Sequence, residues 1–312
     1  MLQSCYMKYI KQLETTANQI RQDIIKMLLA AGSGHSAGPL GMADVFTALY
    51  MGGVAKLDPK KRHAPDRDRV VLSNAHICPV LYATLAHAGY FSHAKLKSLR
   101  KLGSPLQGHS NNHFDIGIET CGGPLGQGLS QAVGFALASR MNAKQSKDES
   151  QKSKVKSPLT THDSRLAANY HTWCLMSDGE FDEGQTWEAV MLAGKYNIRE
   201  LTAIIDRNNI QIDGFTEDVM PLEDFTAKLK ANNWFVIEVD GHNIREILDA
   251  MKKAKSMAAN PTAIICHTIP GKGVDFMENK FEWHGLPPNK EQAKLALHEL
   301  RTFNGKITSE HQ

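Results

Sequence analysis

Short, almost uninterrupted apolar runs alternate along this chain with stretches of helical periodicity. Several runs carry apolar side chains at consecutive positions, as parallel strands do when helices cover both of their faces. The alternation therefore predicts an α/β fold, with a doubly wound parallel sheet and helices on both faces. The predicted strands are 69–73, 172–176, 201–205, 234–239 and 262–266, and the helical stretches between them lie near 77–89, 125–142, 183–196, 223–232 and 243–258.

Two further helices precede the first strand, and one segment departs from the alternation. Apolar residues recur at steps of three and four over 10–31, which places them on one face of a helix, and a second helix is predicted at 43–51. The segment 143–169 is rich in Lys, Ser and Asp and has almost no large apolar residues. Because Asp148 and Glu149 interrupt its positive charge, we expect a solvated insertion there and no nucleic-acid-binding tract.

Composition narrows the class of protein. The 312 residues are 42% hydrophobic, which is enough for a sizeable core, and the length allows one large α/β domain or two smaller ones. Of these we expect a single domain over residues 1–312. A formal charge of +3 gives no argument for binding nucleic acid or an anionic membrane. The five cysteines include no CxxC pair, and neither a signal peptide nor a membrane-spanning run is evident. These features predict a cytoplasmic protein with reduced thiols.

Polar residues follow two neighbouring predicted strands close to the points where the strands end. Asp178 and Gly179 follow the strand at 172–176, and Asn208 follows the next strand, 30 residues after Asp178. Both side chains can therefore lie at the sheet edge where ligands bind in such folds. Carboxylate and amide oxygens suit Mg²⁺ or Ca²⁺, and a glycine permits close approach of a phosphate. The spacing is equally compatible with two ordinary polar turns.

A glycine-dense turn and scattered histidines add weaker signals. Residues 122–128 read Gly-Gly-Pro-Leu-Gly-Gln-Gly at the start of a predicted helix, a place where a planar ligand could lie against the backbone. Their spacing differs from the GxGxxG fingerprint, which argues against a nicotinamide-dependent dehydrogenase. His35, His76, His109 and His284 lie beside glycine or at predicted element ends, where they could contact phosphate and sugar hydroxyls. The spacing alone does not establish that they converge.

Taken in order, these motifs resemble the N-terminal, diphosphate-binding half of transketolase. The similarity runs from about Ile20 to Pro287 and is interrupted chiefly by the insertion. Each motif alone is weakly specific, whereas the ordered set is specific. The set consists of Gly32-Ser33-Gly34-His35, Leu72-Ser73-Asn74-Ala75-His76, Gly123 to Gly128, Asp178-Gly179 with Asn208, Ile212-Asp213-Gly214, and His284-Gly285.

The resemblance implies a thiamine diphosphate-binding fold and an enzyme that transfers a two-carbon ketol unit between sugar phosphates, as in the pentose phosphate pathway. By similarity, Asp178, Asn208 and the backbone carbonyl of Ile210 would hold a divalent ion that bridges the two phosphates. Mg²⁺ is expected, with Ca²⁺ or Mn²⁺ as substitutes.

The resemblance also implies roles for further residues. Glu183 would belong to a carboxylate network that runs towards a subunit interface and supports catalysis. His35 and His109, with His284, would face the carbonyl and hydroxyls of the donor sugar as catalytic and substrate-binding groups. The expected cofactor contacts are His76, Gly179, Asn208 and His284 around the diphosphate, and Gly123, Pro124 and Leu125 along the rings.

The chain also departs from the family pattern. Ser177 replaces a usual glycine, Arg207 stands beside the metal asparagine in place of an acidic or small residue, and Cys121 lies near a usual Thr. None of these changes removes an expected ligand. Only 28 residues follow His284, too few for the family's pyrimidine-binding domain, which supplies an essential glutamate. We therefore expect a split enzyme, with a separate C-terminal transketolase subunit and a heterotetramer of two plus two chains.

Two alternatives remain open at this stage. The first is a related thiamine diphosphate enzyme, either similar to deoxyxylulose phosphate synthase or a ketol transferase for branched or sulfonated sugars. The second is a noncatalytic cofactor-binding module, which predicts decay of the ligand set. The retained carboxylate, amide and histidines argue against that second alternative.

Overall fold

The centre of the molecule is a five-stranded parallel sheet in the order β1-β2-β3-β7-β6. The computed structural model describes residues 2–152 and 170–302, with the backbone alone described for 2–4 and 144–152. Each strand begins and ends within two residues of its predicted position, which confirms the predicted α/β class. The strands are β1 (Arg69–Leu72), β2 (Thr172–Ser177), β3 (Leu201–Arg207), β6 (Phe235–Asp240) and β7 (Thr262–His267).

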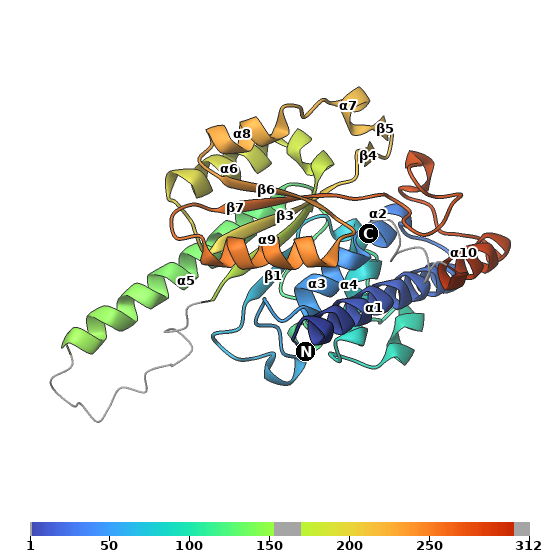
Figure 1. The fold of residues 1–312 in the computed structure, drawn as a ribbon, viewed down its shortest axis with the longest axis horizontal. Helices are drawn as coiled ribbons and strands as arrows, with labels where there is room; N and C mark the ends of the chain where they lie inside the picture. The colour runs from blue at the N-terminus through green and yellow to red at the C-terminus, as the bar shows by residue number, and fades with distance from the viewer. Residues whose placement is uncertain (1, 153–169, 303–312) are drawn as a thin grey trace.

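Helices cover both faces of the sheet, because successive side chains of a strand point to opposite sides. Val70 and Leu72 belong to one buried cluster, whereas Val71, between them, belongs to another. Figure 1 shows α6 and α8 on one side of the sheet and α9, α3 and α1 on the other. One cluster involves α1 (Leu2–Ala31), α3 (Ala43–Met51), α4 (Cys78–His87) and α9 (Ile244–Ser256), and the other involves α5 (Gln127–Lys152), α6 (Gly184–Lys195) and α8 (Phe225–Ala231).

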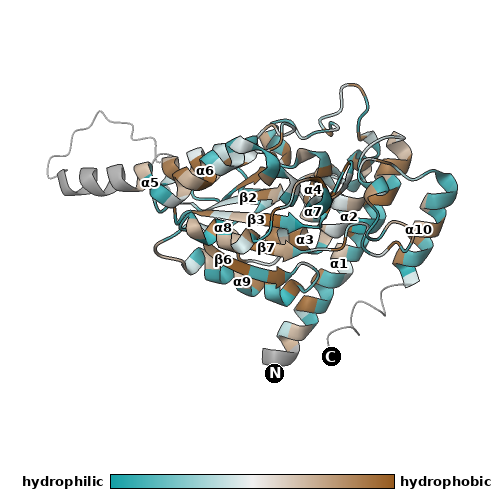
Figure 2. Cartoon of the chain, turned by 90° about the horizontal axis from the view of Figure 1, so that it is seen from above, coloured by the Kyte–Doolittle hydropathy of each residue, from teal (hydrophilic) through white to brown (hydrophobic). Residues whose placement is uncertain are grey.

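Apolar residues are concentrated where the layers meet. Figure 2 shows brown, apolar residues within the sheet and polar residues along the outer side of α9. That helix buries Ile244, Ile247, Leu248 and Met251, which recur at helical spacing on one face. Among the described residues, none of the helices combines the length and the apolar character needed to cross a bilayer.

The helix α5 is longer than predicted. It continues to Lys152 and not to 142, so the residues from 143 to 152 are helical, and the solvated insertion at 143–169 stays a prediction. The physical reason is composition, because these ten residues are mostly Ala, Lys, Gln, Glu, Ser and Asp, with neither Gly nor Pro to end the helix. The remainder of the predicted insertion, 153–169, lies outside the described residues.

Several short elements were not predicted. The helix α10 (Lys290–Thr302) packs on α1, where the Asn18 side chain donates to the carbonyl of Leu300 at 2.8 Å. A two-stranded antiparallel hairpin of β4 (Ile210–Gln211) and β5 (Gly214–Phe215) follows β3. The other short helices are α2 (Ala37–Gly41), α7 (Thr216–Val219), η1 (Pro59–Lys61), η2 (Ala75–Ile77), η3 (His93–Ser98), η4 (Phe114–Ile116), η6 (Asp178–Asp182) and η7 (Phe281–Trp283).

Candidate functional site

Polar loops leave the carboxyl ends of β2 and β3 side by side. The parallel register places Ser177 opposite Asp206, so Asp178 and Asn208 both lie just beyond this edge of the sheet. The backbone N–H of Asn209 donates to Asp178 Oδ2 at 2.9 Å, which ties the two loops together. Asp178 and Asn208, two of the three residues predicted to hold a cation, are therefore neighbours, and both are buried.

The Asp178 carboxylate is held from several directions. Its Oδ1 accepts from the N–H of Gly179 at 2.8 Å, and its Oδ2 accepts from Arg207 Nη1 at 3.1 Å and from Thr216 Oγ1 at 3.4 Å. Burial raises the pKa of Asp178, while Arg207 and the backbone donors act in the opposite direction. The Asn208 carbonyl oxygen accepts from the N–H of Ile210 at 3.0 Å. The oxygens predicted to bind metal are thus fixed in place by this chain's own hydrogen bonds.

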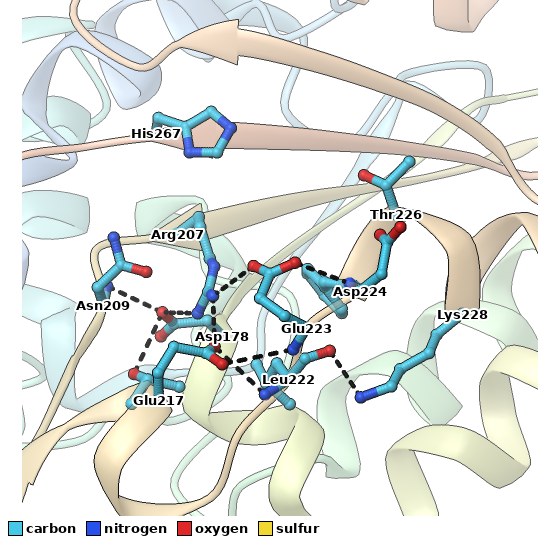
Figure 3. Close-up of polar contacts among 12 residues, drawn as sticks. Asp178, Arg207, Asn209, Glu217, Leu222, Glu223, Asp224, Thr226, Lys228 and His267 are labelled. Atoms are coloured by element: carbon cyan, nitrogen blue, oxygen red, sulfur yellow. Dashed lines mark hydrogen bonds and ion pairs between the residues drawn. The ribbon is translucent and has the colours of Figure 1, made fainter.

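Arg207 connects the predicted metal ligand Asp178 to α7 and to the loop after α7. Its Nη2 lies 2.6 Å from Glu217 Oε1 and 2.8 Å from Glu223 Oε1. Figure 3 shows these contacts as dashed lines. Glu217 in turn accepts from the N–H of Leu222 at 3.2 Å. The guanidinium is therefore shared among three carboxylates, and the contact with Asp178 is one that the sequence did not predict.

Glu180 organises three loops and was also missed as a site residue. Its carboxylate accepts from the Ser73 hydroxyl, from the N–H of Gly126 at 2.8 Å and from the N–H of Ser177 at 2.9 Å. These donors come from the loop after β1, from the last residue of β2 and from the glycine-dense turn. Burial raises the pKa of Glu180 to about 7, against donors that favour its charged form. Its position directly after a strand, in an acidic run, was the available signal.

Glycines in the dense turn are required by close packing. Gly126 has φ +77°, and a Cβ there would lie 2.6 Å from Thr186 Oγ1. A Cβ at Gly128 would lie 2.4 Å from the Cβ of Ser73. Gly179 differs, because a Cβ there would meet only the Gln211 side chain, at 3.5 Å. The packing of this chain does not require glycine at 179, which is consistent with approach of a ligand from outside.

The four histidines converge. The ring of His35 has its centroid 5.0 Å from that of His76, 6.3 Å from that of His109 and 5.5 Å from that of His284. His76 and His284 are 5.1 Å apart. Backbone contacts bring these distant segments together, since the N–H of Gly271 donates to the carbonyl of Ala37 at 2.9 Å. The structure thus settles the convergence that the spacing left open.

Burial keeps these imidazoles neutral. Burial lowers the pKa of His35 to about 4, and repulsion from any positive charge on His284, Arg100 and His109 acts in the same direction. The pKa of His76 is well below its ordinary value, and burial lowers the pKa of His284 as well. A neutral imidazole offers one donor and one acceptor to a ligand. Arg100, which the sequence did not single out, is therefore part of the electrostatic surroundings of the cluster.

The remaining predicted site residues belong to the glycine-dense turn and to the start of α6. Pro124 is exposed and Leu125 is half-buried, and the carbonyl of Leu125 accepts from Gln185 Nε2 at 2.7 Å. Gly123 has φ +145°, and a Cβ there would lie 3.7 Å from the His109 ring. Glu183 is exposed at the start of α6. The network predicted for Glu183 stays a prediction.

Comparison with known proteins decides the family. The family model described as "Transketolase, thiamine diphosphate binding domain" matches residues 12–305. The chain belongs to the transketolase family. It corresponds to the N-terminal, thiamine diphosphate-binding part of these enzymes, as the resemblance predicted.

Relatives of this transketolase chain include separate subunits. It is 38% identical to "6-deoxy-6-sulfo-D-fructose transketolase subunit SqwG" of Clostridium sp. (strain MSTE9), over 92% of this chain and 96% of that protein. It is 34% identical to one of the subunits of an apulose-4-phosphate transketolase of Phocaeicola vulgatus, over 97% of this chain and 98% of that protein. The crystal structure of a transketolase from Campylobacter jejuni superposes with a TM-score of 0.78 at 28% identity, over 97% of this chain but 46% of that one.

Two observations show that the residues of this transketolase chain fit the family's cofactor. Within the described residues, His35 Nδ1 and both polar side-chain atoms of Asn74 are buried without a hydrogen-bond partner. Leaving such atoms unpaired costs about 1–3 kcal/mol each, so they are expected to have a partner in the working protein. The second observation is that a Cβ at Gly179 would meet only the Gln211 side chain, at an ordinary contact distance, beside the Asp178 and Asn208 oxygens, which are of the type that Mg²⁺ prefers.

Proposed function

We propose that this chain is the N-terminal subunit of a split transketolase and that a separate C-terminal subunit, carrying the pyrimidine-binding domain, completes each active site. The observation that carries the proposal is its match to two proteins named as transketolase subunits, each covered almost end to end. The same chain spans less than half of the Campylobacter transketolase. A heterotetramer of two plus two chains is the assembly that we propose.

An apolar surface beside the site supports docking of a partner. Ile212, Phe215, Val219 and Met220 are exposed, and the side chain of Ile212 is 69% accessible. These residues lie on the β4–β5 hairpin, on α7 and directly after α7, close in sequence to Thr216, whose hydroxyl contacts Asp178. Clustered exposed apolar residues of this kind are typical of protein–protein contacts. The partner subunit is the occupant that we propose for this face.

The cation and diphosphate would be bound at the carboxyl edge of the sheet. Asp178, Asn208 and the backbone carbonyl of Ile210 would hold Mg²⁺, for which Ca²⁺ or Mn²⁺ could substitute. His76, Gly179 and His284 would contact the diphosphate. When bound, thiamine diphosphate supplies the carbon nucleophile that cleaves the bond beside a ketose carbonyl and carries the two-carbon fragment.

The histidine cluster would act on the donor sugar. Because burial keeps His35 neutral, its ring can donate a proton to a sugar oxygen at one nitrogen and accept one at the other. His109 and His284 would orient the hydroxyls and carbonyl of the donor, and the neutral form of His109 avoids repulsion from Arg100. Glu183 would extend towards the partner subunit, in line with its exposure.

The substrates that we propose are ketoses and aldoses with a terminal anionic group. Sugar phosphates, including those of the pentose phosphate pathway, are the first choice. A sulfonated ketose is a second candidate, favoured by the 38% identity to the subunit named for 6-deoxy-6-sulfo-D-fructose. A cytoplasmic location fits the five free cysteines, since thiols persist in reducing compartments.

Reconstitution tests the proposal. The chain is purified alone and together with a candidate C-terminal subunit, and ketol transfer from phosphorylated and sulfonated ketoses is assayed with thiamine diphosphate and Mg²⁺. We expect activity only from the mixture, with a mass that fits two copies of each chain. Full activity of this chain alone would refute the split, and a mixture that binds cofactor without ketol transfer would favour the noncatalytic alternative.

A further inference from the structure

A second cluster of potential metal ligands lies away from the histidines of the cofactor site. Asp23 is on α1, His87 is the last residue of α4, and His93 is the first residue of η3. Their candidate ligand atoms, one from each side chain, all lie within 4.8 Å of one another. Since these residues belong to three separate elements, their approach reflects tertiary packing and not sequence proximity alone.

The geometry of the cluster suits a small coordination sphere. Asp23 Oδ2 lies 3.0 Å from His87 Nε2, and the rings of His87 and His93 are nearly perpendicular, with centroids 4.5 Å apart. Ligands of a tetrahedral zinc ion at about 2.0–2.1 Å are about 3.3 Å from one another. Two of the three atoms already have such a separation, and the exposed His93 ring can turn to supply the third.

Lys26 contacts only one oxygen of the Asp23 carboxylate and leaves the other oxygen to face His87. Lys26 Nζ contacts Asp23 Oδ1 at 3.0 Å, whereas Oδ2 faces His87. The carboxylate is thus oriented by a partner on its outer oxygen, as carboxylate ligands of metals commonly are. Asp23 and His87 are also sheltered, with side chains 18% and 14% exposed.

We propose that Asp23, His87 and His93 form a binding site for a borderline first-row divalent cation, with Zn²⁺ as the preferred ion. Two imidazole nitrogens and one carboxylate oxygen are ligands that Zn²⁺ favours over Mg²⁺ or Ca²⁺, which prefer oxygen alone. Water would complete the coordination sphere on the exposed side of His93. The bound ion would link η3 to α1 and α4, and this assignment is independent of the proposed transketolase activity.

Competition with a chromogenic chelator measures the affinity of the full-length chain for Zn²⁺. Saturating Mg²⁺ and thiamine diphosphate are present, so that the cofactor site is occupied. The exposed His93 is a suitable position for substitution, because His93→Ala leaves the contact between Asp23 and His87 in place. We expect His93→Ala to weaken Zn²⁺ binding at least tenfold and to remove one bound equivalent. The matched control is His298→Ala, at an exposed histidine on α10.

Three further measurements test this site and distinguish it from the four histidines of the cofactor site. His109→Ala should leave the zinc affinity unchanged, and anomalous scattering at the zinc edge should show a peak between Asp23, His87 and His93. Zn²⁺ should also raise the melting temperature of the wild-type chain and not that of His93→Ala. The proposal is overturned if His93→Ala binds Zn²⁺ as tightly as wild type, or if the loss of zinc follows His109→Ala instead.

Discussion

Replacement of Arg207 by leucine tests whether this residue holds the predicted metal ligand in place. In the structure its guanidinium contacts Asp178 Oδ2 at 3.1 Å, and both side chains are almost inaccessible, at 4% and 1% exposure. Arg207→Leu would remove that partner and leave a buried carboxylate with backbone donors and the Thr216 hydroxyl. We expect a large loss of stability, because a buried charge that loses its partner cannot recover its hydration.

The magnitude follows from the burial of the three ion pairs. Breaking the buried pair with Asp178 is expected to cost about 3–5 kcal/mol. The pairs with Glu217 and Glu223 involve carboxylates that are 37% and 60% exposed, so each adds about 0–1 kcal/mol. At about 2.1 cal/mol/K per residue, a chain of 312 residues has an unfolding entropy near 0.65 kcal/mol/K. The loss of the buried pair therefore corresponds to a decrease of about 5–8 °C in Tm.

Differential scanning calorimetry of the purified chain measures this decrease, with Glu223→Gln as the matched control that removes only an exposed partner. Mg²⁺ should raise the Tm of Arg207→Leu more than that of wild type, because a bound cation restores a positive charge beside Asp178. A Tm of Arg207→Leu equal to that of Glu223→Gln would show that the buried pair does not stabilise the site. An equal response of both proteins to Mg²⁺ would contradict the link between Arg207 and the metal ligand.

Four further perturbations test other parts of the site. Asp178→Asn should lower the affinities for Mg²⁺ and thiamine diphosphate together, each more than tenfold by calorimetric titration, and an unchanged cofactor affinity would count against the metal assignment. His35→Ala should lower kcat of the reconstituted enzyme by about 10²–10⁴-fold with cofactor affinity near normal; loss of cofactor binding with normal turnover at saturation would reverse that role. Gly126→Ala should reduce the free energy of unfolding by about 1–3 kcal/mol, given φ +77° and the 2.6 Å approach to Thr186, whereas Gly134→Ala, which meets nothing within 4 Å, should be neutral or stabilising. The folded pKa of His35, about 4, is below the ordinary value of 6.5, so the unfolded chain takes up a proton first as pH falls. This contribution to the free energy of unfolding is complete above pH 6.5 and is lost between pH 6.5 and 4. Urea titrations should therefore show that the stability of His35→Ala depends less on pH than that of wild type. An identical pH dependence of the two proteins would contradict the lowered pKa of His35.

Much of the fold could be predicted because β1, β2, β3 and β7 are buried along most of their length. Continuous apolar runs identify such strands directly, and the polar residues that end them mark the carboxyl edge. The short β4–β5 hairpin could not be predicted from periodicity, because each of its strands has only two residues. The end of α5 was placed too early because the prediction relied on apolar periodicity, whereas residues 143–152 are helix formers without an apolar stripe.

Site residues could be predicted only where a local sequence motif contains the reactive or ligating side chains. Asp178 and Asn208 follow consecutive strands, so parallel pairing alone brings them together. His284 meets His35 through packing of the segment that begins after β7, a long-range contact that no local pattern encodes. Glu180 and Arg100 were not predicted as site residues, because their roles depend on long-range contacts with other loops and not on their spacing in the sequence.

Arg207 shows why a departure from a family pattern must be judged from its contacts. The substitution removes no oxygen ligand, yet it places a cation against the carboxylate that is expected to bind another cation. Three carboxylates surround this guanidinium, so the group keeps two net negative charges (3 − 1) and can still attract a divalent ion. Arg207 binds Oδ2 of Asp178, whereas Oδ1 accepts from the N–H of Gly179 and, as a carboxylate oxygen, can accept a second bond. The arginine and the metal therefore need not compete for the same oxygen, and Arg207 can orient the carboxylate for the ion.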